Sequence, residues 1–344
     1  MSPSNLHQDA LVIDSHNDSM VAHIRRGHMG LAGERDPQRR RRPGGVGQLR
    51  QYMPPEQSPP LQLNIPLMRQ GGLDAAFFAV DNTLARNNHL LYATDALGFF
   101  SREVEEHANA IRIARCAADI TQAKAAGQLA AILAVENSNA LEQSIHVLWS
   151  LHQLGVRTIT LTHSTRTWAG DGCEVEGGGG LTTFGRQVVS HMNQWGLLVD
   201  ISHLNDQGFW DVLEQTQKPV IASHSCCRAL CSHPRNLTDE QLRALGQQGG
   251  VVGITFVPMF VKEQNPTFAD LLDHIDHAVQ LAGIDHVGLG SDFDGGGDLV
   301  TSAAEFPDFT TGLQERGYGE DDIRKILGLN HLRLLEETIG RGPE

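Results

Sequence analysis

Residues 129–137 read LAAILAVEN, seven apolar residues followed by Glu136 and Asn137. An apolar run without polar alternation is typical of a strand that is buried on both faces, as in a parallel sheet. Residues 197–203, LLVDISH, have a similar character and end on His203. A buried strand that ends in a polar side chain is therefore the unit from which we predict the fold.

This unit recurs along the chain and alternates with helical patterns. Strands are predicted at residues 11–18, 73–80, 129–137, 156–163, 197–203, 219–225, 249–256 and 286–294. Helices are predicted at residues 94–126, 141–154, 184–195, 206–214, 239–247, 268–282 and 321–337. Eight strands alternating with helices predict an α/β fold, a (β/α)8 TIM-like barrel, with an open doubly wound sheet as the alternative. One such barrel accommodates the whole chain, so we predict a single domain over residues 1–344.

Composition and charge narrow the possible partners and location. The chain has 27 Lys and Arg against 41 Asp and Glu, a formal net charge of −14, which argues against a nucleic-acid or anionic-membrane partner. Five cysteines without a Cys-x-x-Cys pair favour a reducing, cytoplasmic compartment. We expect no secretion signal at the N-terminus and no transmembrane helix, because no apolar run approaches about 18 residues.

Two stretches are predicted to be loops. Residues 33–60 are rich in arginine, from Arg35 to Arg42, and in proline, and we expect a long loop after the first strand. A lid over the substrate is the alternative for this stretch. Residues 169–180, AGDGCEVEGGGG, lack the Gly-Lys-Ser/Thr of a phosphate-binding loop.

Potential metal ligands stand at the ends of the predicted strands. They are His16 and Asp18, Glu136, His163, His203, His224, and Asp292 and Asp294. In a barrel these strand ends meet at the C-terminal mouth. A single histidine at the end of an apolar strand is more often a hydrogen-bonded structural residue. An unpaired buried carboxylate, however, would cost several kcal/mol, so a cation or an arginine is expected near Glu136. One His-x-Asp pair, one glutamate and two further histidines suit two zinc ions that share a carboxylate.

Other hydrolase chemistries lack their motifs. The sequence has no His-Glu-x-x-His helix, and in GLGSD at residues 288–292 Leu289 stands where a nucleophile elbow needs glycine. The same segment fails as a dinucleotide-binding fingerprint because Phe293 occupies the last glycine position. Cys226, Cys227 and Cys231 are interpreted as reduced, packed side chains rather than as a nucleophile or metal ligands.

Taken together, several motifs resemble those of one family. They are VIDSHND at residues 12–18, AVEN at 134–137, LTH at 161–163, VDISH at 199–203, ASHS with RALCSHPRNLTDEQL within 222–242, GLGSDFDG at 288–295 and GLNHLRLLE at 328–336. From about residue 10 to residue 340 the chain resembles the renal (membrane) dipeptidase family, zinc dipeptidases of the amidohydrolase type, in its soluble bacterial form. The block around His224 and Arg235 is the most specific part of the match.

The resemblance implies a role for each strand-end residue. His16 and Asp18 would bind one zinc ion, His203 and His224 would bind the other, and Glu136 would bridge the two. These five residues would thus hold the two zinc ions of each chain.

The resemblance also implies the substrate and the residues that handle it. His163 would contact the substrate and polarise the scissile carbonyl, Arg235 would hold the C-terminal carboxylate of a dipeptide, and Asp292 would be the general acid and base. Relatives are expected to accept a D-residue at the second position and to open β-lactam rings, and homodimers are frequent. Residues 164–171, STRTWAGD, and the stretch Arg35–Arg42 depart from the family pattern, which leaves the side-chain preference open.

Two other functions remain as alternatives. A different metal hydrolase on the same barrel would act on a cyclic amide, a lactone or a deaminase substrate. A binding protein without catalytic activity would use the same barrel only as a scaffold. Arg235 favours a free carboxylate, and therefore a dipeptide, over the first alternative.

Overall fold

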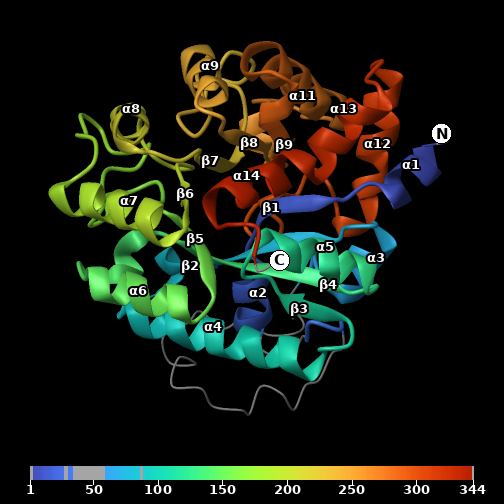
Figure 1. Ribbon diagram of the computed structural model, residues 1–344. Coiled ribbons are helices and arrows are strands. Elements are labelled where there is room, and N and C mark those ends of the chain that lie inside the picture. Colours follow the sequence, from blue (N-terminus) through green and yellow to red (C-terminus); the bar gives the residue numbers. More distant parts are fainter. Residues whose placement is uncertain (1–2, 27–29, 34–58, 86–87, 343–344) are drawn as a thin grey trace.

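The computed structural model describes residues 3–26, 30–33, 59–85 and 88–342, and shows parallel strands surrounded by helices (Figure 1). The barrel strands are β1 (Ile13–Asn17), β2 (Ala75–Asp81), β4 (Leu129–Glu136), β5 (Val156–Thr160), β6 (Leu198–Asp200), β7 (Ile221–Ser225), β8 (Val251–Ile254) and β9 (Val287–Leu289). β2 pairs with both β1 and β4, and β1 pairs with β9, so the ring of eight strands is closed. The predicted barrel is confirmed, and the open sheet is wrong.

The first and last strands meet at a seam that depends on side chains. Asp14 pairs in register with Leu289, and Asn17 forms a bridge with Phe293. The Ser15 hydroxyl donates to the Leu289 carbonyl oxygen at 2.9 Å. Across the same seam, the backbone N–H and the hydroxyl of Ser291 donate to the Asp14 carboxylate at 2.7 and 2.8 Å. These bonds satisfy polar groups that the short strand pairing would leave buried without partners.

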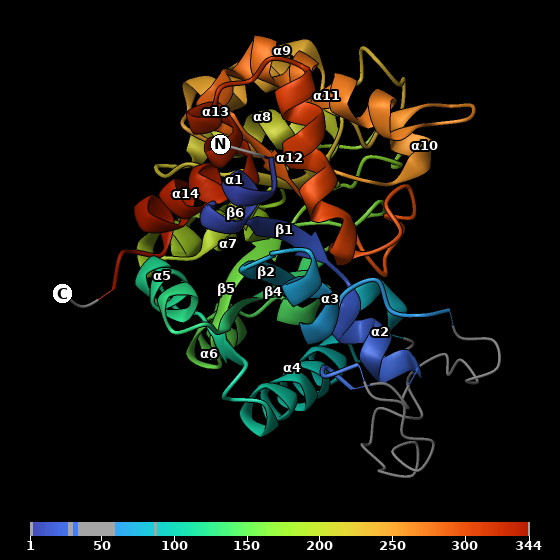
Figure 2. The same cartoon turned by 90° about the vertical axis from the view of Figure 1, so that its right-hand side faces the viewer.

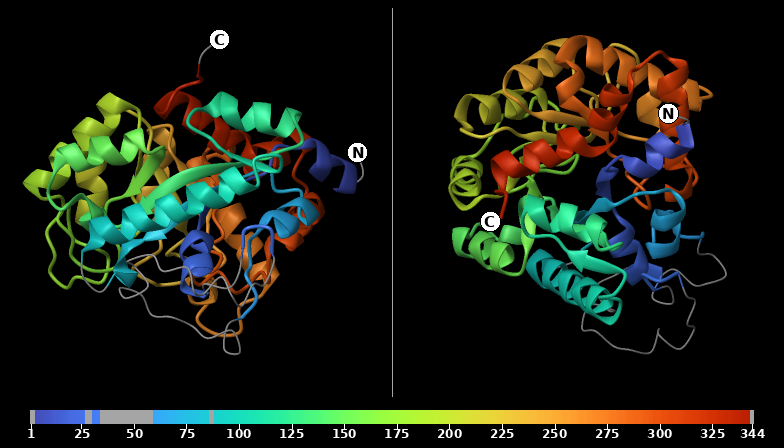
Figure 3. Two further views of the ribbon diagram at one scale, coloured as in Figure 1. Left: turned by 90° about the horizontal axis from the view of Figure 1, so that it is seen from below. Right: turned by 45° about the vertical axis from the view of Figure 1, so that its right-hand side comes forward.

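Helices surround the ring of strands (Figures 2 and 3). They are α1 (Pro3–Asp9), α2 (Ser19–Arg26), α3 (Ile65–Gln70), α4 (His89–Glu106), α5 (Ala117–Ala125), α6 (Ile145–Gln153), α7 (Thr183–Trp195), α8 (Asp206–Gln215), α9 (Asp239–Gln247), α10 (Pro258–Val261), α11 (Phe268–Ala282), α12 (Phe306–Glu315), α13 (Glu320–Arg324) and α14 (Asn330–Thr338). Before α9, Thr238 and Gln241 form the reciprocal capping bonds that this sequence pattern predicts.

Two predicted helices differ from the structure. The Ala-rich stretch 94–126 is not one helix, because β3 (Ile111–Ile113) separates α4 from α5. β3 pairs with the first residues of β4, and the backbone bonds of that pairing replace the helical ones. The predicted helix 321–337 contains a π-helical segment, Lys325–Leu329. There Gly328 lies so close to β1 that a Cβ atom would overlap the Leu11 carbonyl oxygen.

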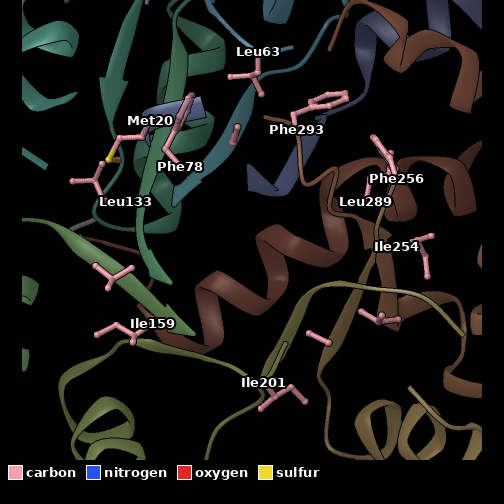
Figure 4. Close-up of a cluster of buried hydrophobic side chains, with 14 of the residues drawn as sticks. Met20, Leu63, Phe78, Leu133, Ile159, Ile201, Ile254, Phe256, Leu289 and Phe293 are labelled. Atoms are coloured by element: carbon pink, nitrogen blue, oxygen red, sulfur yellow. The ribbon is translucent and has the colours of Figure 1, made fainter. Parts of the chain in front are cut away.

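Alternate residues of the strands enter two different hydrophobic clusters. Phe78 and Leu133 belong to the larger cluster, which includes residues of the surrounding helices (Figure 4). Phe77 and Ile132, one position earlier, belong to a second cluster that includes Leu334 of α14. Because side chains two apart in a strand share a face, the face of Phe77 and Ile132 continues to the carboxylates at the strand ends.

The predicted loops have different outcomes. Apart from its ends, the arginine- and proline-rich stretch 33–60 lies outside the described residues, so neither the loop nor the lid interpretation is tested. Residues 169–180 form irregular structure, in which Gly170 bridges Leu181 before α7. Among the described residues, no helix has the length and apolar character needed to cross a membrane.

Candidate metal centre

The C-terminal strand ends surround a cavity of about 530 Å³. Its lining includes the predicted residues Asp18, Glu136, His163, His203, His224, Arg235, Asp292 and Asp294. His16 lies against the same group, since the centroid of its ring is 3.7 Å from that of His224, with the two rings tilted by 31°. Residues separated by most of the chain are therefore brought together as the barrel prediction required.

Glu136 lies between two sets of donor atoms. Its Oε1 is 2.9 Å from His203 Nε2 and 3.6 Å from His224 Nε2. Its Oε2 is 3.7 Å from His16 Nε2. Ligand atoms of His16, Asp18 and Glu136 all lie within 4.8 Å of one another, as do those of Glu136, His203 and His224. The two sets share one carboxylate, which has an oxygen toward each.

Burial disfavours the charged forms of Glu136 and of the three histidines around it. It lowers the pKa of His16 to about 3 and those of His203 and His224 well below the usual value, with Arg235 and neighbouring histidines adding to the effect. Burial also raises the pKa of Glu136 well above its usual value, and the nearby carboxylates of Asp18, Asp81 and Asp292 raise it further. Neutral imidazoles around crowded carboxylates are the donor set that a divalent cation binds.

Hydrogen bonding in the cluster leaves donor positions that fit a metal. Among the described residues, His16 Nε2 is buried without a hydrogen-bond partner and lies 3.7 Å from Glu136 Oε2. A buried polar atom without a partner costs about 1–3 kcal/mol. The nitrogens of His203 and His224 also face each other, although neutral imidazoles share at most one proton between them. The residues present therefore fit bound cations at Glu136.

Three of the predicted residues that line the cavity, His203, Asp292 and Asp294, have left-handed backbone conformations. His203 has φ 69° and Asp292 has φ 60°, and each lies three residues beyond the end of its strand. A non-glycine residue in this region costs about 1–3 kcal/mol, and such strain is common at functional sites. Here the Asp292 N–H donates to the His16 carbonyl oxygen at 3.0 Å. Burial raises the pKa of the Asp292 carboxyl to about 6, although Arg235 opposes this shift.

Arg235 is a buried cation with free donors. It is 3% exposed, and its guanidinium lies 5.3 Å from the centre of the Phe260 ring. Its Nη2 donates to the His224 carbonyl oxygen at 2.9 Å. Among the described residues its Nε and Nη1 have no hydrogen-bond partner. Since Arg235 lines the cavity, these N–H groups are available to an anionic group of a ligand.

The remaining predicted residues differ in their surroundings. His163 is half-buried and stacks on His203, with ring centroids 4.1 Å apart. Asp294 lines the cavity but is held by the protein itself, because it accepts hydrogen bonds from the Ser19 hydroxyl at 2.6 Å and the Gln62 N–H at 3.2 Å.

Sequence reasoning missed two buried carboxylates at the site. Asp81 ends β2 and lies in register with Glu136, and these two residues and His163 have ligand atoms within 4.8 Å of one another. The signal was present, since AVDN at residues 79–82 parallels AVEN at 134–137. Asp200, at the end of β6, lies behind His16 and His224. The sequence did not single out Asp200, because His203, three residues later, was taken as the polar residue that ends this strand.

Comparisons with known proteins agree with this geometry. The model of the membrane dipeptidase family, peptidase family M19, matches residues 2–341. A curated relative, dipeptidase verJ from Clonostachys rogersoniana, is 34% identical over 242 residues. That match covers 68% of this chain and 62% of the relative, so the chain spans less than two thirds of the relative's length.

Solved structures share the fold over nearly the whole chain. Dipeptidase AC, a metallopeptidase of family M19, is 27% identical with a TM-score of 0.82, covering 96% of this chain and 99% of that one. A metallopeptidase from Rhodobacter sphaeroides, liganded with a phosphinate mimic of the dipeptide L-Ala-D-Ala, is 26% identical with a TM-score of 0.81. That alignment covers 96% of this chain and 100% of the other.

Proposed function

The chain belongs to the membrane dipeptidase family, and on that premise we propose that it is a binuclear zinc dipeptidase. The proposed substrates are dipeptides with a free C-terminal carboxylate. The observation that carries the proposal is the position of Glu136, which has one carboxylate oxygen toward His16 and the other toward His203 and His224. We treat residues 1–344 as one hydrolase domain, because barrel elements extend from β1 to α14.

The proposed metal ligands follow the two donor sets. His16 and Asp18 would hold one zinc ion, His203 and His224 the other, and Glu136 would bind both. When bound, the pair of ions would supply Lewis-acid polarisation and a water molecule of lowered pKa. Burial lowers the pKa of the imidazoles, which favours the neutral form that binds zinc. Burial raises the pKa of the Glu136 carboxyl group, so the cations would displace any proton that it holds.

Asp292 is the proposed general base and acid. Its carboxylate lines the cavity and lies beside that of Asp18, since a Cβ atom at Gly295 would overlap an oxygen of each. From this position it would take a proton from the attacking water and return it to the leaving amine. Burial raises its pKa to about 6, which brings the carboxyl closer to the pH at which both transfers are efficient.

Arg235 and His163 are the proposed substrate-binding residues. Arg235 Nε and Nη1 have no hydrogen-bond partner among the described residues, so the guanidinium would be able to donate to the carboxylate at the end of a dipeptide. His163 is half-buried at the cavity wall and would polarise the scissile carbonyl. A fixed cation at one end of the cavity would restrict the substrates to short peptides.

Three further features belong to the proposal. Acceptance of a D-residue at the second position is supported by the L-Ala-D-Ala mimic in the Rhodobacter sphaeroides relative. A reducing, cytoplasmic location is supported by the five cysteines, which are all among the described residues and are free thiols. A homodimer is proposed from the resemblance alone, and light scattering of the purified protein would test it.

Zinc content and a substrate panel test the function. We expect about two zinc ions per chain and cleavage of dipeptides, with lactones, cyclic amides and nucleosides left intact. Asp292→Asn should retain the zinc while kcat falls about 100-fold or more. Activity on lactones or nucleosides instead would favour the other metal hydrolases. Less than about one zinc per chain would favour a binding protein without catalytic activity.

A further inference from the structure

A buried hydrogen-bonded chain lies behind His16 and His224, on the side away from Glu136. It consists of Ser223, in β7, and Asp200, at the end of the neighbouring strand β6. Their exposed fractions are 2% and 1%, so water does not compete for these bonds. The proposed function assigns neither residue a role.

Asp200 acts only as an acceptor. Its Oδ1 accepts from the backbone N–H groups of Ser202 and Ser223, at 3.0 and 3.1 Å. Its Oδ2 accepts from the hydroxyls of Thr160 and Ser223, both at 2.6 Å. Since a carboxylate has no proton to give, the single hydroxyl proton of Ser223 points toward Asp200.

Ser223 Oγ can therefore only accept from its other neighbours. It lies 2.8 Å from His224 Nδ1 and 3.4 Å from His16 Nδ1. An imidazole that donates from Nδ1 keeps its lone pair on Nε2. His224 Nε2 faces His203, and His16 Nε2 faces Glu136. The lone pairs of both rings are thus directed to the proposed metal positions.

Ser202 is consistent with this direction of the bonds. Its hydroxyl oxygen accepts from the His224 backbone N–H at 3.1 Å and lies 3.4 Å from Ser223 Oγ. Ser202 therefore does not need the Ser223 proton, and the two lone pairs of Ser223 Oγ serve both imidazoles when the Ser202 proton points elsewhere.

We propose that Asp200 and Ser223 are positioning residues that fix the Nδ1-protonated tautomer of His224 and, through the longer contact, of His16. One hydroxyl would then orient one ligand in each half of the centre. The inference rests on the proposed metal role of His16 and His224. Partners that orient metal ligands in this way typically change metal affinity by about 10- to 100-fold when they are removed.

Asp200→Asn tests the direction of the chain. The asparagine oxygen must stay at the Oδ1 position, where two backbone N–H groups point, so its NH2 group replaces Oδ2 and donates to Ser223. The Ser223 proton then turns to His224 Nδ1, and the lone pair leaves Nε2. Zinc affinity, measured by competition with a chelator, should fall about 10- to 100-fold.

Thr160→Val is the matched control. It removes the other hydroxyl bonded to Asp200 Oδ2 but leaves the bond between Ser223 and Asp200. Its zinc affinity should remain close to that of the wild type. A loss as large as that of Asp200→Asn would assign the effect to general disturbance of Asp200 and overturn the inference.

The tautomer itself gives a second readout that needs no turnover. Long-range ¹H–¹⁵N spectra of the metal-free protein should show His224 protonated on Nδ1 in the wild type and on Nε2 in Asp200→Asn. Ser223→Ala, should Asp200→Asn not fold, is expected to show mixed tautomers and weaker zinc binding. An unchanged tautomer with unchanged zinc affinity in the folded variant would overturn this inference alone, whereas a wild type that binds no zinc would overturn the proposed function with it.

Discussion

The Nε2 atoms of His203 and His224 lie 2.9 Å apart, although the residues come from different strands of the barrel. Both atoms also lie within 3.6 Å of the same oxygen of Glu136.

We therefore expect His203→Gln to lose one of about two zinc ions and to lower kcat/KM about 100-fold or more, because a cation stabilises transition-state charge by several kcal/mol. Elemental analysis after dialysis measures the zinc. His191→Gln, on α7, is the control, and a full zinc content in His203→Gln would contradict the ligand assignment.

Arg235→Lys should separate charge from geometry. Lysine keeps the positive charge but loses the planar fork that suits a carboxylate. We expect kcat/KM for dipeptides with a free C-terminus to fall about 10- to 100-fold, and that for amidated dipeptides to stay nearly constant. Arg228→Lys is the control, because Arg228 pairs with Asp206 in an exposed contact. Equal losses on both substrates would show that Arg235 supports the structure rather than the substrate.

Gly295 and Gly296 provide a matched pair beside the cavity. A Cβ atom at Gly295 would overlap Asp18 Oδ2 and Asp292 Oδ1, whereas at Gly296 the nearest atom would be Val257 Cγ2 at 3.6 Å. Gly295→Ala should therefore displace both carboxylates and lower kcat about 100-fold or more, while Gly296→Ala retains activity. Steady-state kinetics of the two variants measure the effect on catalysis, and thermal unfolding measures the effect on the stability of the fold. Similar kcat values for both variants would mean that catalysis does not depend on the positions of the Asp18 and Asp292 carboxylates.

His331 predicts a pH dependence of stability away from the site. Its ring is fully buried against Gly288, neither nitrogen has a hydrogen-bond partner among the described residues, and burial lowers its pKa from 6.5 to about 3. The unfolded chain takes up this proton below pH 6.5 and the folded protein does not, so the free energy of unfolding falls as the pH is lowered from 6.5 toward 3.

This fall should amount to about 1.4 kcal/mol per pH unit from this residue. His331→Leu should remove that contribution, which urea unfolding at a series of pH values would measure. The exposed His146→Leu serves as the control for the loss of one histidine. Parallel pH profiles of the wild type and His331→Leu would show that His331 does not couple unfolding to protons.

Most of the fold could be predicted because buried parallel strands have an unmistakable apolar pattern. The strands around Glu136 and His224 lie within the predicted ranges. The stretch from residue 94 to residue 126 was wrong because an edge strand of three residues, β3, is defined by its pairing with β4 rather than by its own sequence. The π-helical turn near Gly328 likewise depends on a contact with Leu11 that is remote in sequence.

The candidate site could be predicted only in part. The histidines after strands were identified because several of them recur at strand ends together with Glu136, although each alone is more often a structural residue. Asp81 and Asp200 were missed because an aspartate at a strand end is equally common as a cap or turn residue. Their relation to Glu136 and Ser223 appears only when the strand register is known. The free donors of Arg235 are also a property of packing that no local pattern reports.

The seam between β1 and β9 has a consequence for the order of events during synthesis. The first strand contains His16 and is followed by Asp18, while β9 begins 274 residues after the start of β1 and is followed by Asp292. A growing chain therefore presents two of the five proposed ligands well before the other three have been synthesised. All five precede β9, so a truncated product that lacks β9 would retain every proposed ligand but would have neither the closed ring of strands nor Asp292.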